Sequence, residues 1–502
     1  MRLLLLLLSF LWLGNGASAS PGRLWVVDPQ GMPPAEQALT ASIQGQLNRT
    51  QATVWVKGRG AATWVLEDLQ KEGWTLETST SPWPLLETFR SRLRGFITCQ
   101  LNDASFNAAT SLAGPRDAVV VDASRRQRMM DLGWTELFDA RGLRESDVLE
   151  RFGPEFTRGI AIHQPINKPL HLRDLAVAQR AFTFFDVTPQ QRQEWIRSLG
   201  PRTRVLGWGL DERDFVGDVS AGGGVVIPAD WALNLSALQH LPTPVPERPR
   251  SAPHAPLRDE ERVVCFVISD GDNVQWLLNG FVEAPGFWAS PHRGRFAVTW
   301  ELAPSLAQWA PRVLARLYRT ATAADDFIAG PSGSGYYFPS LSPTALDQAR
   351  ATAQSLAPAQ LGLVTVLNAG GGLDAADAIV EAPGVSGVLY KDYAPYNRFR
   401  GAVRWHTGKP IVSYRHLLWE ERRRDGSLRP DWLPEAVAQS IGQLPVGPGR
   451  EAERFALVNV HAWSFRDSGG PMGAIARTIA ALPPQVRIVT ATEFFTLLKP
   501  SR

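Results

Sequence analysis

The sequence predicts an α/β protein in which a C-terminal (β/α) barrel follows an α/β N-terminal domain. Short apolar, β-branched runs alternate with segments of helical length along the whole chain, as in βαβ units with parallel strands. After residue 262 the alternation becomes regular, and eight such units match the size of a (β/α) barrel. An open doubly wound sheet has the same local pattern and remains the alternative. A chain of 502 residues is too long for one core, so two or three domains are expected.

The first 19 residues predict a signal peptide. An apolar run over 3–13 follows Met1 and Arg2, and Ala17-Ser18-Ala19 is a small-x-small cleavage site. The run is too short to span a bilayer, and no later apolar run is longer. We therefore expect a secreted or periplasmic protein that is not inserted into a membrane after cleavage.

The N-terminal domain is expected over 20–240 and a linker over 241–261. Repeated prolines among mixed charges favour an extended linker. In the domain before it, apolar runs predict strands and amphipathic runs predict helices. The predicted strands are 24–28, 53–57, 95–99, 118–122 and 205–209, and the main predicted helices are 36–47, 61–71, 106–112 and 173–185.

The C-terminal domain is expected over 262–502. Its first strand, 263–268, is a buried-type apolar run that is too short for a helix. The later strands are predicted at 296–302, 327–329, 362–367, 387–390, 410–414, 455–460 and 486–489. The helices between them are predicted at 304–320, 343–356, 375–380, 434–444 and 473–482, with a last one at 492–498.

Polar and aromatic residues follow almost every predicted C-terminal strand. In a parallel barrel such residues converge on one mouth, where ligands bind. The set includes several acids, two histidines and neighbouring aromatics, which turns alone seldom supply. It comprises Asp270, Asp272, Glu301, Ser332, Ser334, Tyr336, Asn368, Lys391, Asp392, Arg415, His416, His461 and Trp463.

The turn after the first C-terminal strand, Ser269-Asp270-Gly271-Asp272-Asn273, has two possible interpretations. It places two carboxyl groups at the mouth, as an active site requires. The structural alternative is a polar turn in which Asp272 or Asn273 caps the next helix.

The composition of the chain limits the kinds of partner and ligand that are expected. The net charge of +3 is close to balanced, and no Lys/Arg block of the kind that follows nucleic acid is present, so no nucleic-acid partner is expected. Two cysteines are too few for a Cys-based metal site. The 18 tryptophans offer flat faces for sugar rings, although most tryptophans fill cores. The sequence does not predict the oligomeric state.

The segment Gly333-Ser334-Gly335-Tyr336-Tyr337-Phe338-Pro339 resembles the signature G-x-G-Y-x-Y-P, with Phe338 in place of the second Tyr. A family of proposed glycoside hydrolases is named after this signature. The segments 269–276, 42–49, 206–209 and 234–236 also resemble blocks of that family, so the resemblance covers nearly the whole mature chain. It implies a sugar-processing enzyme with a barrel of the glycosidase or deacetylase type.

The leading hypothesis is glycoside hydrolysis of a poly- or oligosaccharide without a cofactor. This chemistry needs two carboxyl groups across the scissile bond. We expect Asp270 or Asp272 to pair with Glu301 or Asp392. Aromatic side chains would form a sugar platform, and polar side chains would bind its hydroxyl groups. These substrate-binding candidates are Trp276, Tyr336, Tyr337, Asn368, His461 and Trp463.

Two other functions remain open. Asp270 with His416 and His461 would suit a zinc-dependent polysaccharide deacetylase, because an Asp and two His residues can hold Zn²⁺ and activate water. No H-x-x-x-H pair is present, so these histidines would have to converge from separate strands. The third possibility is a carbohydrate-binding protein that uses the same mouth without catalysis.

Overall fold

The computed structural model describes residues 22–498, apart from 186, 242, 250–254, 344, 424, 448–449 and 451. The predicted signal peptide and part of the predicted linker lie outside the described residues. In the described part, no helix combines the length and the apolar character needed to cross a membrane.

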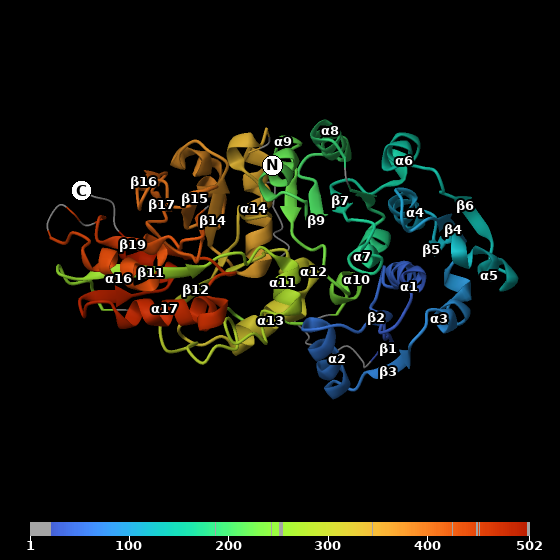
Figure 1. Cartoon of the computed structure of the whole chain (residues 1–502), viewed down its shortest axis with the longest axis horizontal. Helices are drawn as coiled ribbons and strands as arrows, with labels where there is room; N and C mark the ends of the chain where they lie inside the picture. Colours follow the sequence, from blue (N-terminus) through green and yellow to red (C-terminus); the bar gives the residue numbers. More distant parts are fainter. Residues whose placement is uncertain are drawn as a thin grey trace, which may run out of the picture.

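The described residues form four sheets where the sequence suggested two domains (Figure 1). Three small parallel sheets come first in the chain. The C-terminal unit (β11 to α18) lies at the left of Figure 1, the third unit (β7 to α10) in the middle, and the first (β1 to α3) and second (β4 to α6) at the right. The expected N-terminal domain therefore contains three sheets, each with its own helices.

The first unit has the strand order β2-β1-β3, and the second has the order β5-β4-β6. The first consists of β1 (Arg23–Val27), α1 (Pro34–Leu47), β2 (Val54–Val56), α2 (Ala61–Lys71), β3 (Thr75–Ser79) and α3 (Trp83–Thr88). The second consists of β4 (Gly95–Cys99), α4 (Ser105–Ala113), β5 (Ala118–Asp122), α5 (Arg126–Asp131), β6 (Glu136–Asp139) and α6 (Glu145–Phe152).

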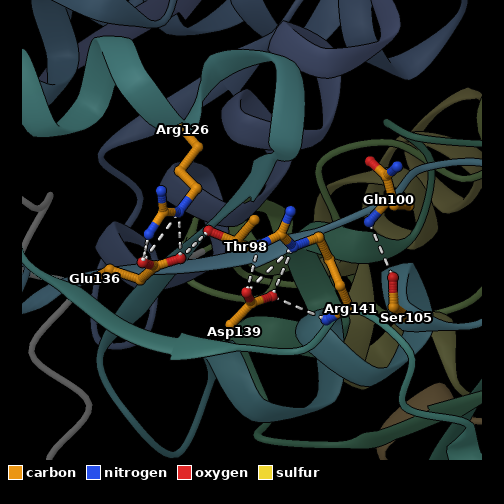
Figure 2. Close-up of polar contacts among 7 residues, drawn as sticks. All are labelled: Thr98, Gln100, Ser105, Arg126, Glu136, Asp139 and Arg141. Atoms are coloured by element: carbon orange, nitrogen blue, oxygen red, sulfur yellow. Dashed lines mark hydrogen bonds and ion pairs between the residues drawn. The ribbon is translucent and has the colours of Figure 1, made fainter.

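Ion pairs fix the edge strand β6 of the second unit (Figure 2). The Arg126 guanidinium binds both oxygens of Glu136, which also accepts a hydrogen bond from the buried Thr98 hydroxyl of β4. Arg141 binds Asp139 in the same two-point manner. Two-point guanidinium–carboxylate pairs set direction as well as distance, so Arg126 and Thr98 tie the first residue of this strand to α5 and β4, whereas the Arg141–Asp139 pair is local.

The third unit has the order β10-β9-β7-β8, with all strands parallel. Its helix α8 begins with a capping box, in which Thr188 and Gln191 bond each other's backbone N–H groups. Its elements are β7 (Ile160–His163), α7 (Arg173–Ala178), β8 (Phe182–Phe184), α8 (Pro189–Leu199), β9 (Arg204–Gly207), α9 (Glu212–Ala221), β10 (Val225–Ile227) and α10 (Leu235–Leu238).

The C-terminal unit contains a curled half-barrel sheet with the order β16-β17-β15-β14-β13-β12-β11-β19-β18. Only β16 is antiparallel to its neighbour. The strands are β11 (Arg262–Ile268), β12 (Val298–Leu302), β13 (Asp325–Ala329), β14 (Leu363–Asn368), β15 (Gly387–Asp392), β16 (Val403–His406), β17 (Lys409–Ser413), β18 (His416–Leu418), β19 (Phe455–Val460) and β20 (Val486–Ile488). The helices are α11 (Val274–Asn279), α12 (Leu306–Trp309), α13 (Pro311–Thr320), α14 (Ala345–Ala359), α15 (Asp377–Glu381), α16 (Pro434–Gly442), α17 (Gly470–Ala480) and α18 (Ala491–Leu497).

This sheet differs from the eight-unit barrel that the sequence suggested. β11 pairs directly with β19 over six residues, so no strand stands between them. The last predicted strand, β20, pairs only with the first three residues of β11, outside the main strand path. Two residues separate β17, which pairs with β15, from β18, which pairs with β19. All eight predicted strands are therefore present, together with β16 and β18, which were not predicted, and the last predicted strand does not take the place of an eighth barrel strand.

The units share cores and polar contacts. One buried apolar cluster contains side chains from β1, β7 and β11, and thus joins the first, third and C-terminal units. Arg312 of α13 donates two hydrogen bonds of 2.7 Å to Glu72, which follows α2. Tyr336 forms a pair of backbone hydrogen bonds with Val226 of β10, of 2.7 and 2.8 Å. The signature loop is thereby attached to the third unit.

Candidate active site

A cavity of about 250 Å³ lies between the third unit and the carboxyl ends of several C-terminal strands. This is the edge of a parallel sheet where ligands bind. The cavity is lined by Trp208, Glu212, Pro228, Ser269, Asp270, Asp272, Asn273, Glu301, Pro331, Tyr336, Leu367, Lys391, Tyr396, His461 and Trp463.

The turn after β11 places its two carboxyl groups in this cavity because its backbone is packed tightly. Asp270 adopts a left-handed conformation with φ 68°, and its N–H donates to Glu301 Oε2 at 3.1 Å. A Cβ on Gly271 would lie 1.5 Å from the Glu301 carbonyl oxygen, so only glycine fits there. Asn273 caps α11 by accepting a hydrogen bond from the Trp276 N–H. The capping interpretation is thus correct for Asn273, and it leaves both aspartates free to face the cavity.

Asp272 has the strongest perturbation of the acids in the cavity. Burial raises its pKa well above the usual value, and the neighbouring carboxyl groups of Asp270 and Glu301 raise it further. Part of its surface nevertheless remains open to the cavity. A carboxyl group in this environment keeps its proton to a higher pH than an exposed one, as a proton donor requires.

Glu301 and Lys391 form a buried ion pair beneath the aspartates. Lys391 Nζ lies 3.5 Å from Glu301 Oε1, and both side chains are at least 95% buried. Burial raises the pKa of Glu301, an effect that Lys391 opposes. Lys391 also donates to Asn459 Oδ1 at 3.3 Å. Because Glu301 binds the Asp270 backbone as well, this pair fixes the position of the turn.

The third unit contributes a further acid, Glu212, at the first residue of α9. Asp211 caps that helix by accepting from the Asp214 N–H. The Tyr336 hydroxyl donates to Glu212 Oε1 at 2.8 Å, and burial raises the pKa of Glu212. Trp208 stacks on Tyr336 with ring centroids 6.3 Å apart. Residues of the third unit and of the signature loop thus form one wall of the cavity together.

Aromatic groups and a histidine from the strands on the other side of β11 complete the lining. Trp463 packs against Trp276, with ring centroids 4.8 Å apart. The His461 ring stacks on Trp419 at 4.2 Å, and its Nδ1 lies 2.8 Å from the Ser464 hydroxyl. Burial lowers the pKa of His461. A neutral imidazole beside an indole suits the binding of an uncharged hydroxyl-bearing ring.

The structure brings together only some of the residues that the sequence singled out. The cavity contains Asp270, Asp272, Glu301, Tyr336, His461 and Trp463. Trp276 does not line the cavity and packs against Trp463. Tyr337 is buried beside the cavity, and its carbonyl accepts from the Ser332 hydroxyl. The Asn368 side chain is engaged by the Gly370 carbonyl and the Ser340 N–H, which orders the loops after β13 and β14.

Asp392 does not line the cavity because of the alternation of side chains along a strand. Lys391 and Asp392 are successive residues of β15 and therefore point to opposite faces. Lys391 faces the cavity, whereas Asp392 accepts hydrogen bonds from Tyr390 and Arg398, at 2.8 and 3.1 Å. Asp392 is therefore not placed to form the expected carboxyl pair with Asp270 or Asp272.

The proposed metal ligands Asp270, His416 and His461 are not arranged as a site. Within the described part of the chain, no group of three or more His, Cys, Asp and Glu side chains is placed to hold a metal ion. His416 does not line the cavity, and burial lowers its pKa to about 4. The geometry gives the deacetylase hypothesis no support.

Sequence reasoning missed Glu212, Trp208 and Tyr396, and did not give Lys391 a role. The stretch Leu206-Gly207-Trp208-Gly209-Leu210-Asp211-Glu212 does carry a signal, since an aromatic and two acids directly follow the strand β9. This stretch reaches the cavity only because the strand ends of the third unit pack against the strand ends of the C-terminal unit.

Comparison with known proteins agrees with this architecture. Models of the GxGYxYP first, second and third domains match residues 23–91, 93–156 and 158–240. The model described as the GxGYxYP putative glycoside hydrolase C-terminal domain matches residues 261–499. A search of curated proteins found no match.

A solved structure described as a putative hydrolase from Bacteroides thetaiotaomicron has a similar fold. Its sequence is 24% identical, the TM-score is 0.83, and the similarity covers 95% of this chain and 94% of that one. At this identity the likeness concerns the fold. Because the four family models together span nearly the whole chain, this protein belongs to the GxGYxYP family of putative glycoside hydrolases.

Proposed function

We propose that this protein is an exported glycoside hydrolase that acts on an oligo- or polysaccharide, with Asp272 as the proton donor and Asp270 as the ionised carboxylate. The observation that carries the proposal is the placement of these two carboxyl groups in one cavity that also offers aromatic faces. Glycoside hydrolysis needs a protonated acid and an ionised carboxylate on either side of the scissile bond.

The surroundings divide the roles between the two aspartates. The raised pKa of Asp272 keeps a proton available for the departing glycosidic oxygen. Asp270 accepts a short hydrogen bond of 2.5 Å from the Ser269 hydroxyl and shares the cavity with the Lys391 ammonium group. In this scheme Glu301 is a positioning residue, and Trp463, Trp208 and His461 bind the sugar.

The test uses the leaving group of the substrate. A screen of aryl glycosides and polysaccharides first identifies the sugar. For the Asp272→Asn variant we then expect roughly a thousandfold loss of kcat on the natural glycoside, because a general acid contributes about 10²–10⁴-fold. The loss should be much smaller on the 2,4-dinitrophenyl glycoside of the same sugar, whose leaving group needs no proton. Asp131→Asn, an exposed change in the second unit, serves as the control.

Two results would contradict the proposal. An equal loss of kcat on both substrates would show that Asp272 is not the proton donor. Glycan binding without product release, even over long incubations, would favour a carbohydrate-binding protein. Export is tested separately, because the mature protein should begin at Ser20 if the signal peptide is cleaved after Ala19.

A further inference from the structure

A second, larger cavity of about 590 Å³ lies between the third unit and the helices α12 and α14 of the C-terminal unit. Its walls include the amino ends of β7 and β9, the strand edge opposite the active-site cavity. It is lined by Arg158, Gly159, Pro201, Arg202, Arg204, Val225, Pro304, Ser305, Ala307, Gln308, Ser334, Gln348, Ala351, Gln354, Ser355 and Pro358.

Three arginines give this cavity a positive charge that nothing in its lining neutralises. Arg158 precedes β7, Arg202 precedes β9, and Arg204 is the first residue of β9. The lining contains no Asp or Glu, and none of the three guanidinium groups forms an ion pair with a described carboxylate. Arg204 is instead held by Gln308 Oε1 at 2.5 Å and by the Trp309 ring.

Two buried polar groups in the same wall also lack partners among the described residues. Ser334 is 92% buried, and its hydroxyl has no hydrogen-bond partner. Gln348 is fully buried, and its Nε2 donates to the Gly223 carbonyl at 3.1 Å. This bond fixes the direction of the amide and leaves Oε1 unbonded. Unpartnered buried polar groups are costly, so they point to a ligand or ordered water that bonds them.

We propose that this cavity is a binding site for an oxyanionic group, a carboxylate, sulfate or phosphate, carried on a hydroxyl-bearing molecule such as an acidic sugar. Guanidinium groups match the planar, multidentate geometry of such anions. The Ser334 hydroxyl and Gln348 Oε1 are closed to solvent in this structure, so a ligand or an ordered water can bond them only after a shift of this wall. The proposal is independent of glycosidase activity.

The location gives the site a direct connection to the signature loop. Ser334 lines this cavity, whereas Pro331 and Tyr336 of the same loop line the active-site cavity. Gly333, with φ 95° and no room for a Cβ beside Thr352, and Gly335, which approaches Val225 closely, make this compact course possible. A ligand in this cavity therefore lies against the loop whose Tyr336 bonds Glu212.

Isothermal titration calorimetry on the full-length mature protein tests the proposal with inorganic sulfate, inorganic phosphate, D-glucuronate and uncharged D-glucose. We expect the anions to bind and glucose not to bind. In the double variant Arg158→Gln/Arg202→Gln the affinity should fall roughly tenfold or more, because two charged hydrogen-bond donors are lost. Arg204 is left intact because its contacts with Gln308 and Trp309 support the fold.

A control variant separates the local site from the overall charge. Arg197→Gln/Arg319→Gln removes the same charge from exposed positions outside the cavity and should bind the anions as the wild type does. Tighter binding of D-glucuronate than of inorganic anions would assign the site to a sugar-borne carboxylate, and the reverse order to a free oxyanion. Equal binding by the wild type and by Arg158→Gln/Arg202→Gln would overturn the proposal. An absence of anion binding by the wild type would overturn it too, and this measurement does not depend on how well the variant folds.

Discussion

Asp272 links stability and function at the scale of a single residue. A carboxyl group whose pKa is raised by folding binds its proton more tightly in the native state than in the unfolded chain. Its contribution to stability is therefore complete below the unfolded pKa of about 4 and is lost as the pH rises toward the folded pKa. The burial that raises the pKa of Asp272 thus costs stability as the pH rises above about 4.

Asp272→Asn should remove this pH dependence. The amide has nearly the same shape and no charge, so the free energy of unfolding of the variant, minus that of the wild type, should increase with pH above about 4. The slope should reach at most about 1.4 kcal/mol per pH unit, the value for one proton. Urea unfolding at several pH values measures it. A difference that stays constant or falls between pH 5 and 8 would show that Asp272 is not held protonated by the fold.

The residues that sequence reasoning found and missed differ in where they come from. Asp270, Asp272 and Glu301 follow or end strands of one sheet, so the rule that strand ends converge was enough to group them. Glu212 lies in a different unit, and its role depends on how two units dock, which no local pattern encodes. Asp392 was expected at the cavity, but the residue before it in β15, Lys391, faces the cavity, so Asp392 points to the opposite side of the sheet.

At the scale of elements, the turn after β11 depends on its contact with β12. Gly271 lies directly against the Glu301 carbonyl, and Gly330 after β13 leaves room for Asp272, since a Cβ there would lie 2.9 Å from the Asp272 nitrogen. Three strand ends therefore pack backbone against backbone. This packing directs both acids into one small cavity, which a polar turn alone would not do.

Gly271→Ala should disrupt both folding and activity. The new Cβ would lie 1.5 Å from a backbone oxygen that is held within the sheet, so the turn must shift and carry Asp270 and Asp272 with it. We expect a destabilisation of about 1–3 kcal/mol or more, as in overpacked cores, together with loss of turnover. Gly280→Ala, at the residue that follows α11, has nothing within 4 Å of its Cβ and is the control. Wild-type thermal stability and activity in Gly271→Ala would show that the turn tolerates a side chain.

Element boundaries also show what periodicity can and cannot predict. All eight predicted C-terminal strands are present, because each is an apolar run of suitable length, but β16 and β18 were not predicted. The order of the sheet was not predicted, because only tertiary pairing decides that β19 lies beside β11 over six residues while the short β20 pairs with three. The break between β17 and β18, where the chain changes partners after two residues, leaves no distinct pattern in the sequence.

At the scale of the whole molecule, the four sheets are joined more closely than separate domains usually are. One apolar cluster joins the first, third and C-terminal units, and a second one joins the second and third units to Tyr336 and Phe338 of the signature loop. Phe338 replaces the second tyrosine of the signature and is fully buried there, packed against Tyr336 and Tyr393. The signature loop therefore packs the units together and also contributes Tyr336 to the lining of the candidate active-site cavity.

These shared cores predict that the protein unfolds as one cooperative unit. Multidomain proteins commonly deviate from two-state behaviour, but here removal of one unit would expose the apolar surface of its neighbours. We expect a single calorimetric transition in which the calorimetric and van't Hoff enthalpies agree, and coincident urea transitions by circular dichroism and tryptophan fluorescence. Two resolved transitions would show that the units fold independently. In that case the wall formed by Glu212 and Trp208 would be free to open, and the active-site cavity would depend on docking of the third unit rather than on a fixed scaffold.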